Sequence, residues 1–252
     1  MTKKIATREA YGEALMEVGE KNSNVVVLDA DLSKSTKTAG FGKKFPDRFF
    51  NMGISEQNMM GTAAGLATTG KIPFVSTFAM FATGRAFEII RNSIGYTNLN
   101  VKICATHAGL TVGEDGASHQ ALEDIACMRV IPNMTVIVPA DAIEAKAAIH
   151  AITEMVGPAY VRLGRAGVPI INHEGSYRFE IGKGALLKEG KDATIIATGI
   201  MVSEALEASR ILEEKGLSVR VINIHTIKPI DKEIIIKAAK ETGAIVTVEE
   251  HN

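Results

Sequence analysis

The sequence contains few of the residues that build disulfides, metal sites or membrane spans. Only two cysteines are present, Cys104 and Cys127, in apolar segments without CxxC spacing. We expect both to be reduced core residues, which favours a reducing, cytoplasmic setting. No apolar run approaches the ~20 residues of a membrane span. The charged N-terminus has the pattern of a helix, so we expect no signal peptide.

Neither sign of charge is in excess, because 28 Lys and Arg residues face 29 Asp and Glu residues. This balance argues against nucleic acid or a membrane surface as the main partner. The sequence also lacks a GxGxxG with a following acidic residue, a Walker loop, zinc-ligand spacing and Ser-His-Asp ordering. We therefore predict no metal site made by this chain alone.

Short apolar runs alternate with helical patterns over residues 1–166. Strands are expected at residues 25–28, 49–54, 73–78, 101–105, 135–138 and 158–163. Helices are expected at residues 7–21, 56–69, 79–96 and 141–156, with Thr7, Ser55 and Asp141 at their starts. This alternation predicts an α/β domain with a doubly wound, mostly parallel sheet.

A second α/β domain is predicted at residues 185–252. Residues 167–184, which contain Pro169, Asn172, Gly175 and Gly182, show little periodicity and are interpreted as an interdomain linker. Strands and helices then resume at residues 193–197, 203–215, 219–224, 231–241 and 244–248. The last strand has no helix after it, although parallel strands are normally covered on both faces. We therefore expect the second domain to be incomplete.

The densest group of reactive side chains lies in the loop CATHAGLTVGEDGASHQ, residues 104–120. It follows an apolar strand and contains His107, Glu114, Asp115 and His119 among three glycines. Glycine allows the backbone to fold such side chains back over a strand end, where parallel sheets bind ligands. Ser118 is expected to cap a following helix. A solvated surface loop is the alternative interpretation.

Strand ends should bring further side chains to the same edge of the sheet: Asp31, Glu56, Phe78, His107 and Arg165. Glu56 opens a helix rich in Gly and Ala, so we expect it to be buried. Burial without a cationic partner would raise its pKa and suit it to proton exchange. The helix N-terminus favours the anion, and a role limited to the helix dipole is the alternative.

Phe78 and Phe81 could form an apolar wall for a flat ring, although their spacing fits ordinary core packing better. Arg8, Ser35 and Arg165 are candidates for binding phosphate, since guanidinium groups donate paired hydrogen bonds. His150, His173 and His225 are expected to be structural. From the residues alone, the prediction is an α/β protein with an anion-and-acid site at one sheet edge.

Six segments, in order along the chain, resemble the C-terminal half of transketolase, most closely its split, two-polypeptide form. They are IATREA, DADLSKS, GISEQNM, STFAMF, THAGLTVGEDGASHQ and YVRLGRA. The long histidine-containing block is the specific one. The resemblance covers essentially the whole chain and implies a pyrimidine-binding domain of a thiamine diphosphate enzyme, followed by the family's C-terminal domain. The implied activity is transfer of a two-carbon ketol unit from a ketose phosphate to an aldose phosphate, as in the non-oxidative pentose phosphate pathway.

The resemblance also implies roles for individual residues. Glu56 matches the catalytic glutamate that hydrogen-bonds N1′ of the aminopyrimidine. Phe78 and Phe81 match the aromatic pocket, and Asp31 matches an acid close to the cofactor. The groups that hold the substrate phosphate are matched by Arg8, Ser35, His107 and Arg165. Asp115 and His119 match residues that contact sugar hydroxyls. His119 could also move protons during cleavage.

Two positions depart from the family pattern. Gly84 stands where a tyrosine usually completes the ring pocket, and Gly164 replaces a serine. The domain that binds Mg²⁺ and the cofactor's diphosphate is missing, and the residues 113–116, GEDG, belong to the loop of residues 104–120. The resemblance therefore implies an N-terminal partner chain that supplies the metal site, no catalysis by this chain alone, and a heterotetramer of two chains of each kind.

Three alternatives remain open at this point. A 1-deoxyxylulose-5-phosphate synthase has a similar loop but usually carries an arginine where this chain has His107. The β subunit of a 2-oxoacid dehydrogenase E1 component shares the SEQ helix but lacks the GEDGxxHQ block. A regulatory or binding module that kept the fold is the alternative from a different class.

Overall fold

A seven-stranded sheet forms the centre of the first domain. The structure, a computed structural model, describes residues 3–251, and the strand order is β12-β6-β7-β5-β4-β2-β3. The strands are β2 (Val25–Asp29), β3 (Phe49–Asn51), β4 (Ile72–Ser76), β5 (Lys102–Ala105), β6 (Thr135–Ile137), β7 (Ala159–Arg162) and β12 (Thr226–Lys228). Every neighbouring pair is parallel except β12 with β6. The mostly parallel sheet is confirmed.

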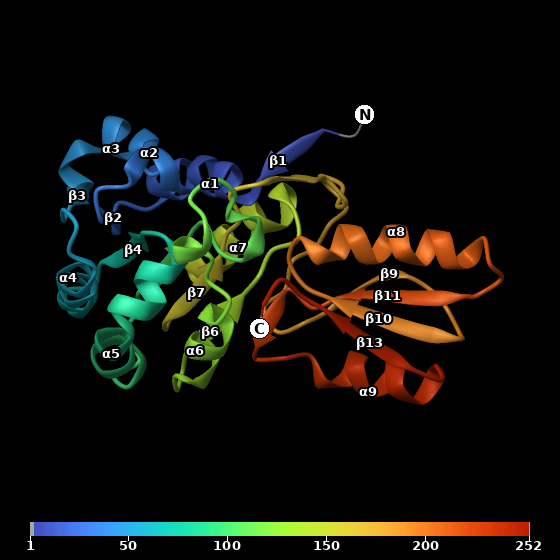
Figure 1. Cartoon of the computed structure of the whole chain (residues 1–252). Coiled ribbons are helices and arrows are strands. Elements are labelled where there is room, and N and C mark those ends of the chain that lie inside the picture. Colours follow the sequence, from blue (N-terminus) through green and yellow to red (C-terminus); the bar gives the residue numbers. More distant parts are fainter. Residues whose placement is uncertain (1–2, 252) are drawn as a thin grey trace.

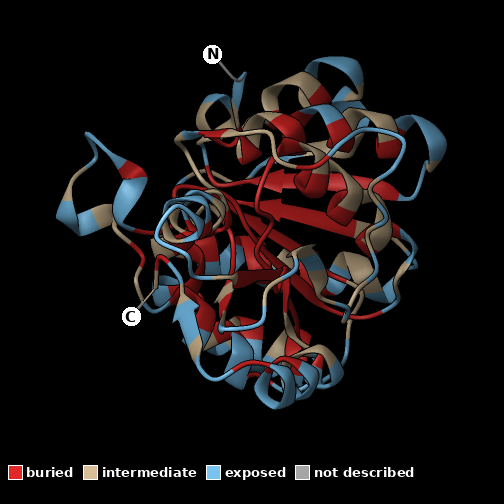
Figure 2. Cartoon of the chain, turned by 90° about the vertical axis from the view of Figure 1, so that its right-hand side faces the viewer, coloured by how far each residue is buried: buried red, intermediate tan, exposed pale blue. Residues whose placement is uncertain are grey.

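Helices cover both faces of this sheet (Figure 1). On one face lie α1 (Thr7–Lys21), α3 (Ala39–Lys44) and α7 (Ala142–Glu154), with α2 (Ser33–Thr36) nearby. On the other lie α4 (Glu56–Thr68), α5 (Phe87–Ile89) and α6 (Asp124–Val130). Apolar side chains of the strands point to both faces and bury two separate clusters, so the red, buried residues gather around the strands in Figure 2. The predicted doubly wound arrangement is confirmed.

The second domain is a four-stranded sheet of order β13-β10-β11-β9. Its strands are β9 (Ala185–Lys188), β10 (Ala193–Ala197), β11 (Val219–Asn223) and β13 (Ile245–Val248), and only β9 runs antiparallel. One helix covers each face, α8 (Met201–Glu213) and α9 (Lys232–Glu241), as Figure 1 shows. Both helices carry an apolar stripe that packs on the sheet.

The two domains are joined by more than a connecting segment. β12 follows β11 in the chain yet pairs with β6 of the first sheet. Within the segment predicted as a linker, β8 (Gly167–Pro169) pairs antiparallel with β1 (Lys4–Ala6). Phe179 and Ile181 of the same segment pack against the α1–α7 cluster. Much of this segment therefore has fixed contacts.

Several local expectations were wrong. The helix expected over residues 79–96 is broken by two π-helical turns, Phe81–Arg85 and Ile90–Gly95. Ser118 caps no helix, because residues 117–119 form a 3₁₀ turn and the next helix begins only at Asp124. Ser55 precedes α4 without a side-chain capping bond. Thr7 lies inside α1, and its hydroxyl accepts a hydrogen bond from the Gly164 amide at 2.8 Å instead.

Within residues 3–251, no helix has the length and apolar character needed to cross a bilayer. No group of three or more His, Cys, Asp or Glu side chains in that range is placed to hold a metal ion.

Candidate active site at the strand ends

The predicted site residues gather at the carboxyl ends of four neighbouring strands. Asp31 follows β2, Phe78 follows β4, His107 follows β5 and Arg165 follows β7, and these strands are adjacent in the order β7-β5-β4-β2. Short parallel bridges continue this edge, since Phe78 pairs with Thr106 beyond the ends of β4 and β5. Parallel strands place such residues at one edge, where ligands bind in open α/β sheets.

His107 is buried and held in one tautomer. Its ring stacks on Phe78 with the centroids 3.8 Å apart. A guanidinium group can only donate, so Arg8 Nη1 donates to His107 Nε2 at 3.1 Å. Nδ1 then carries the proton and donates to Thr106 Oγ1 at 2.8 Å. Burial, followed by the charge of Arg8, lowers the pKa of His107 to about 4. The imidazole is therefore neutral at pH 7.

The backbone at His107 has a φ of 60°, and that at Asp31 has a φ of 64°. Such left-handed conformations are uncommon for residues other than glycine and concentrate at functional sites. Asp31 accepts a hydrogen bond from Asn51 Nδ2 at 2.9 Å. Both unusual backbone positions thus lie at the edge that the sequence singled out.

Asp29, which sequence reasoning did not assign, fixes the loop that carries Asp31 and Ser35. Its buried carboxylate accepts hydrogen bonds from the Leu32 amide at 2.6 Å, Thr36 Oγ1 at 2.6 Å and Thr38 Oγ1 at 2.9 Å. Burial raises the pKa of Asp29, and the three hydrogen-bond donors partly oppose this rise. The Ser35 carbonyl in turn accepts from Arg8 Nη1 at 2.9 Å. The signal in the sequence was an acid at a strand end followed by hydroxyl residues.

The cation Arg165 faces the loop of residues 107–120, which we call the substrate loop. Arg165 forms ion pairs with Glu114 and, at 3.8 Å, with Asp115. Gly113, with a φ of 84°, approaches so closely that an added Cβ would lie 2.7 Å from Arg165 Nη1. Glu114 is exposed, so its pair with Arg165 contributes little stability and can be replaced by a competing anion.

His119 lies edge-on to the two phenylalanine rings. Its centroid is 5.2 Å from that of Phe81 and 6.0 Å from that of Phe78, and the phenylalanines stack at 5.6 Å. Its Nδ1 is 2.9 Å from Ser118 Oγ. The substrate loop thus reaches across the aromatic pair. Phe78 is buried, whereas Phe81 is half-exposed.

Glu56 is buried at the start of α4, as expected, but the expectation that it has no cationic partner was wrong. Arg85 Nη1 lies 2.9 Å from Glu56 Oε1. The same guanidinium stacks over the Phe81 ring at 4.0 Å. Arg85 is the last residue of the π-helical turn Phe81–Arg85, and it lies 29 positions after Glu56 in the sequence. Helical periodicity alone did not indicate it.

A cavity of about 240 Å³ lies at this point, lined among others by Asp31, Glu56, Phe81 and Arg85. It combines a buried acid with an aromatic face, which fits a flat heterocycle that presents a basic nitrogen. An added Cβ at Gly84 would meet only the methyl group of Met80, at 3.0 Å. Arg85 lines this cavity and directly follows Gly84, the position where the family pattern has a tyrosine.

Two family models match the chain: the transketolase pyrimidine-binding domain over residues 3–170 and the transketolase C-terminal domain over residues 182–252. The chain belongs to the transketolase family. A relative from Methanocaldococcus jannaschii that is named as a transketolase C-terminal section is 60% identical, covering 97% of this chain and 77% of the relative. A 6-deoxy-6-sulfo-D-fructose transketolase subunit from Clostridium sp. is 42% identical, covering 96% of this chain and 75% of the relative.

The fold agrees with a solved structure described as a split-gene transketolase in an inactive β4 tetramer. The TM-score is 0.91 at 61% identity, covering 99% of this chain and 81% of that one. The resemblance to the C-terminal half of a split transketolase, inferred from the six sequence segments, is confirmed. Human transketolase is 39% identical over 98% of this chain, which corresponds to 40% of the human protein.

Proposed function

We propose that this chain is the C-terminal subunit of a split transketolase that transfers a two-carbon ketol unit between sugar phosphates. The observation that carries the proposal is the cavity of Glu56 and Phe81 at the same sheet edge as the cations Arg8 and Arg165. A transketolase needs a place for the aminopyrimidine of thiamine diphosphate beside a place for an anionic sugar. The cavity would take part of the aminopyrimidine, and the two arginines would take part in binding the anionic sugar.

Bound thiamine diphosphate supplies the carbon nucleophile and the electron sink for the two-carbon fragment. Glu56 would hold a proton against N1′ of the pyrimidine, and Phe81 and Phe78 would flank the ring. Arg85 pairs with Oε1 of the Glu56 carboxylate, so N1′ would bind Oε2 or replace Arg85. Asp31 would stand close to the cofactor, from the loop after β2.

Arg8 and Arg165, with Ser35, would bind the substrate phosphate. Neutral His107 aims Arg8 through the hydrogen bond to Nε2 and keeps a second positive charge from forming beside it. Asp115 would accept hydrogen bonds from sugar hydroxyls. His119 would contact a hydroxyl as well and move a proton during carbon–carbon cleavage.

The diphosphate and its Mg²⁺, or another divalent cation, would be held by an N-terminal partner chain. The resemblance implies that the cofactor lies between two domain types, and this chain matches the pyrimidine-binding one. A closed heterotetramer with two chains of each kind is the symmetric arrangement. We place this enzyme in the cytoplasm, in the non-oxidative pentose phosphate pathway, and propose no nucleic-acid or membrane partner.

The first experiment is a ketol-transfer assay with xylulose 5-phosphate, ribose 5-phosphate, thiamine diphosphate and Mg²⁺. The chain is assayed alone and with a candidate chain that carries the diphosphate-binding domain. We expect activity only in the mixture. Full turnover by this chain alone would contradict the proposal. Pyruvate as the donor tests the synthase alternative, and a sulfonated ketose tests the specificity named for the Clostridium relative.

In the active mixture, Glu56→Ala should lower ketol transfer by at least about 100-fold, because it removes the group that exchanges a proton with the cofactor. Assembly with the partner, followed by size-exclusion chromatography, should not change. Glu88→Ala removes an exposed acid from the next helix and is the matched control. A regulatory module that only kept the fold would lose nothing with either substitution.

A further inference from the structure

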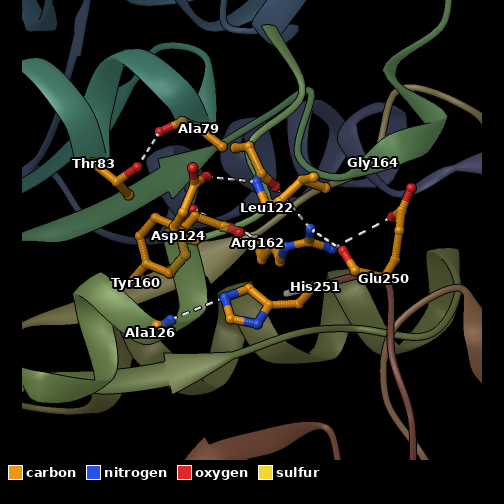
Figure 3. Close-up of polar contacts among 12 residues, drawn as sticks. Ala79, Thr83, Leu122, Asp124, Ala126, Tyr160, Arg162, Gly164, Glu250 and His251 are labelled. Atoms are coloured by element: carbon orange, nitrogen blue, oxygen red, sulfur yellow. Dashed lines mark hydrogen bonds and ion pairs between the residues drawn. The ribbon is translucent and has the colours of Figure 1, made fainter. Parts of the chain in front are cut away.

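A buried network of charges lies beneath the substrate loop, between the two domains (Figure 3). Arg162, the last residue of β7, donates from Nε to Asp124 Oδ2 at 2.9 Å and to Oδ1 at 3.2 Å. Tyr160 donates to the same carboxylate at 2.7 Å. All three side chains are at most 7% exposed. The network is therefore rigid, since a buried charge is costly to separate from its partner.

Glu250, two residues beyond β13 of the second domain, completes this network. Its backbone carbonyl accepts from Arg162 Nη2 at 2.8 Å, and its carboxylate lies 3.5 Å from Arg162 Nη1. Figure 3 shows the guanidinium of Arg162 between Asp124 and Glu250. His251 fixes the same segment from the other side, because its Nε2 accepts from the Ala126 amide at 3.1 Å. The position of Glu250 is thus set by two separate contacts.

The remaining oxygen of Glu250 binds the substrate loop itself. Oε1 accepts a hydrogen bond from the Thr111 amide at 2.5 Å. Gly109 packs on the same carboxylate with a φ of 84°, and an added Cβ would lie 2.2 Å from it. The amide of Gly109 donates to the Ala121 carbonyl at 3.0 Å, which closes the base of the loop. A charge from the second domain therefore fixes the backbone between His107 and Asp115.

We propose that Glu250 is a positioning residue for the substrate loop. By fixing residues 109–111, it sets the position of His107 before them and of Asp115 and His119 after them. The second domain would thus shape the sugar-binding side of the site without contacting the substrate. The link to the substrate rests on the proposed function, whereas the effect on the loop does not.

The test begins with the full chain alone, by amide hydrogen exchange of peptides that span residues 105–123. Glu250→Ala should make the Thr111 amide exchange at least about tenfold faster, because it removes the acceptor. Glu249→Ala changes an exposed acid one residue away and should leave the loop unchanged. Unchanged exchange in Glu250→Ala would overturn the proposal, whatever the enzyme's reaction.

A second variant guards against a general loss of folding. Gly109→Ala places a methyl group against the carboxylate, so it should disturb the loop more when Glu250 is present than in the double variant Gly109→Ala/Glu250→Ala. Equal disturbance in both backgrounds would contradict a contact between the two residues.

In the active mixture, Glu250→Ala should raise the KM for the ketose phosphate by about tenfold. The thiamine diphosphate concentration for half-maximal activity should stay within about twofold, because Glu250 contacts the loop at Gly109 and Thr111 and not at Glu56 or Phe81. A parallel loss of cofactor affinity would indicate general destabilisation and overturn the positioning role. If the wild-type mixture transfers no ketol group, the proposed function fails, and the exchange experiment still decides the effect on the loop.

Discussion

A single histidine fixes the position of a cation at the candidate site. His107 is neutral because the surrounding protein excludes water and because the charge of Arg8, which donates to its Nε2, lies beside it. Protonation would place a second cation beside Arg8 and break that hydrogen bond. The arrangement keeps the guanidinium in place without depending on a titrating partner near pH 7. The same arrangement makes the folded protein less stable at low pH.

We expect His107 to make the protein less stable as the pH falls from about 6.5 to about 4. Its pKa is about 4 in the folded state and 6.5 when unperturbed, so the unfolded state binds the extra proton in this window. We compare the wild type with His107→Asn, because asparagine tolerates a positive φ. As the pH falls over this range, the wild type should lose roughly 1–3 kcal/mol of unfolding free energy relative to His107→Asn. Urea denaturation at several pH values measures it, and a constant difference would refute it.

At the scale of helices and strands, a buried cap joins two parts of the chain. Asp141 precedes α7, and its Oδ1 accepts from the Glu144 amide at 2.8 Å. Its Oδ2 accepts from the Ile171 and Asn172 amides at 2.9 and 2.8 Å. One carboxylate thus starts a helix and fixes the chain after β8. The sequence predicted the helix start, but the second pair of bonds joins residues thirty positions apart.

Asp141→Ala should therefore destabilise the fold by about 3 kcal/mol, because it removes a helix cap and leaves buried amides without an acceptor. Ser55→Ala is the matched control, since Ser55 also precedes a helix but makes no capping bond. It should change the unfolding free energy by less than about 0.5 kcal/mol. Equal losses in the two variants, measured by thermal and urea denaturation, would contradict this account.

These elements also explain what could be predicted from the sequence. The parallel strands are short apolar runs, and their order along the chain was enough to place Asp31, Phe78, His107 and Arg165 at one edge. β12 was missed because Thr226–Lys228 is too short to show a pattern and pairs with a strand about ninety residues earlier. The pairing of Glu56 with Arg85 was missed because the two residues lie 29 positions apart and Arg85 stands in a π-helical turn that the α-helical pattern did not indicate. Contacts between distant segments leave no local pattern.

On the scale of the whole molecule, the two domains share buried polar groups as well as a sheet. Glu144 of α7 accepts hydrogen bonds from the Ala140 amide at 2.6 Å and from Asn223 Nδ2 of β11 at 2.8 Å. Tyr177, from the segment between the domains, donates to the same carboxylate. Arg162 and Glu250 form a similar connection beneath the substrate loop. The domains should therefore unfold together.

Glu144 gives this connection a pH dependence opposite to that of His107. Burial raises its pKa from 4.5 to about 7, so the folded state binds the proton more tightly than the unfolded state does. Its contribution to stability is present below pH 4.5 and is lost as the pH rises to about 7. Glu144→Gln stays neutral and keeps an acceptor oxygen. Its unfolding free energy should therefore rise relative to that of the wild type by roughly 1–3 kcal/mol as the pH rises through this window. Urea denaturation followed by circular dichroism tests this, with Glu154→Gln, an exposed acid of the same helix, as the control. If Glu144→Gln and the wild type keep the same difference from pH 4.5 to 7.5, Glu144 is not the buried titrating group that joins the domains.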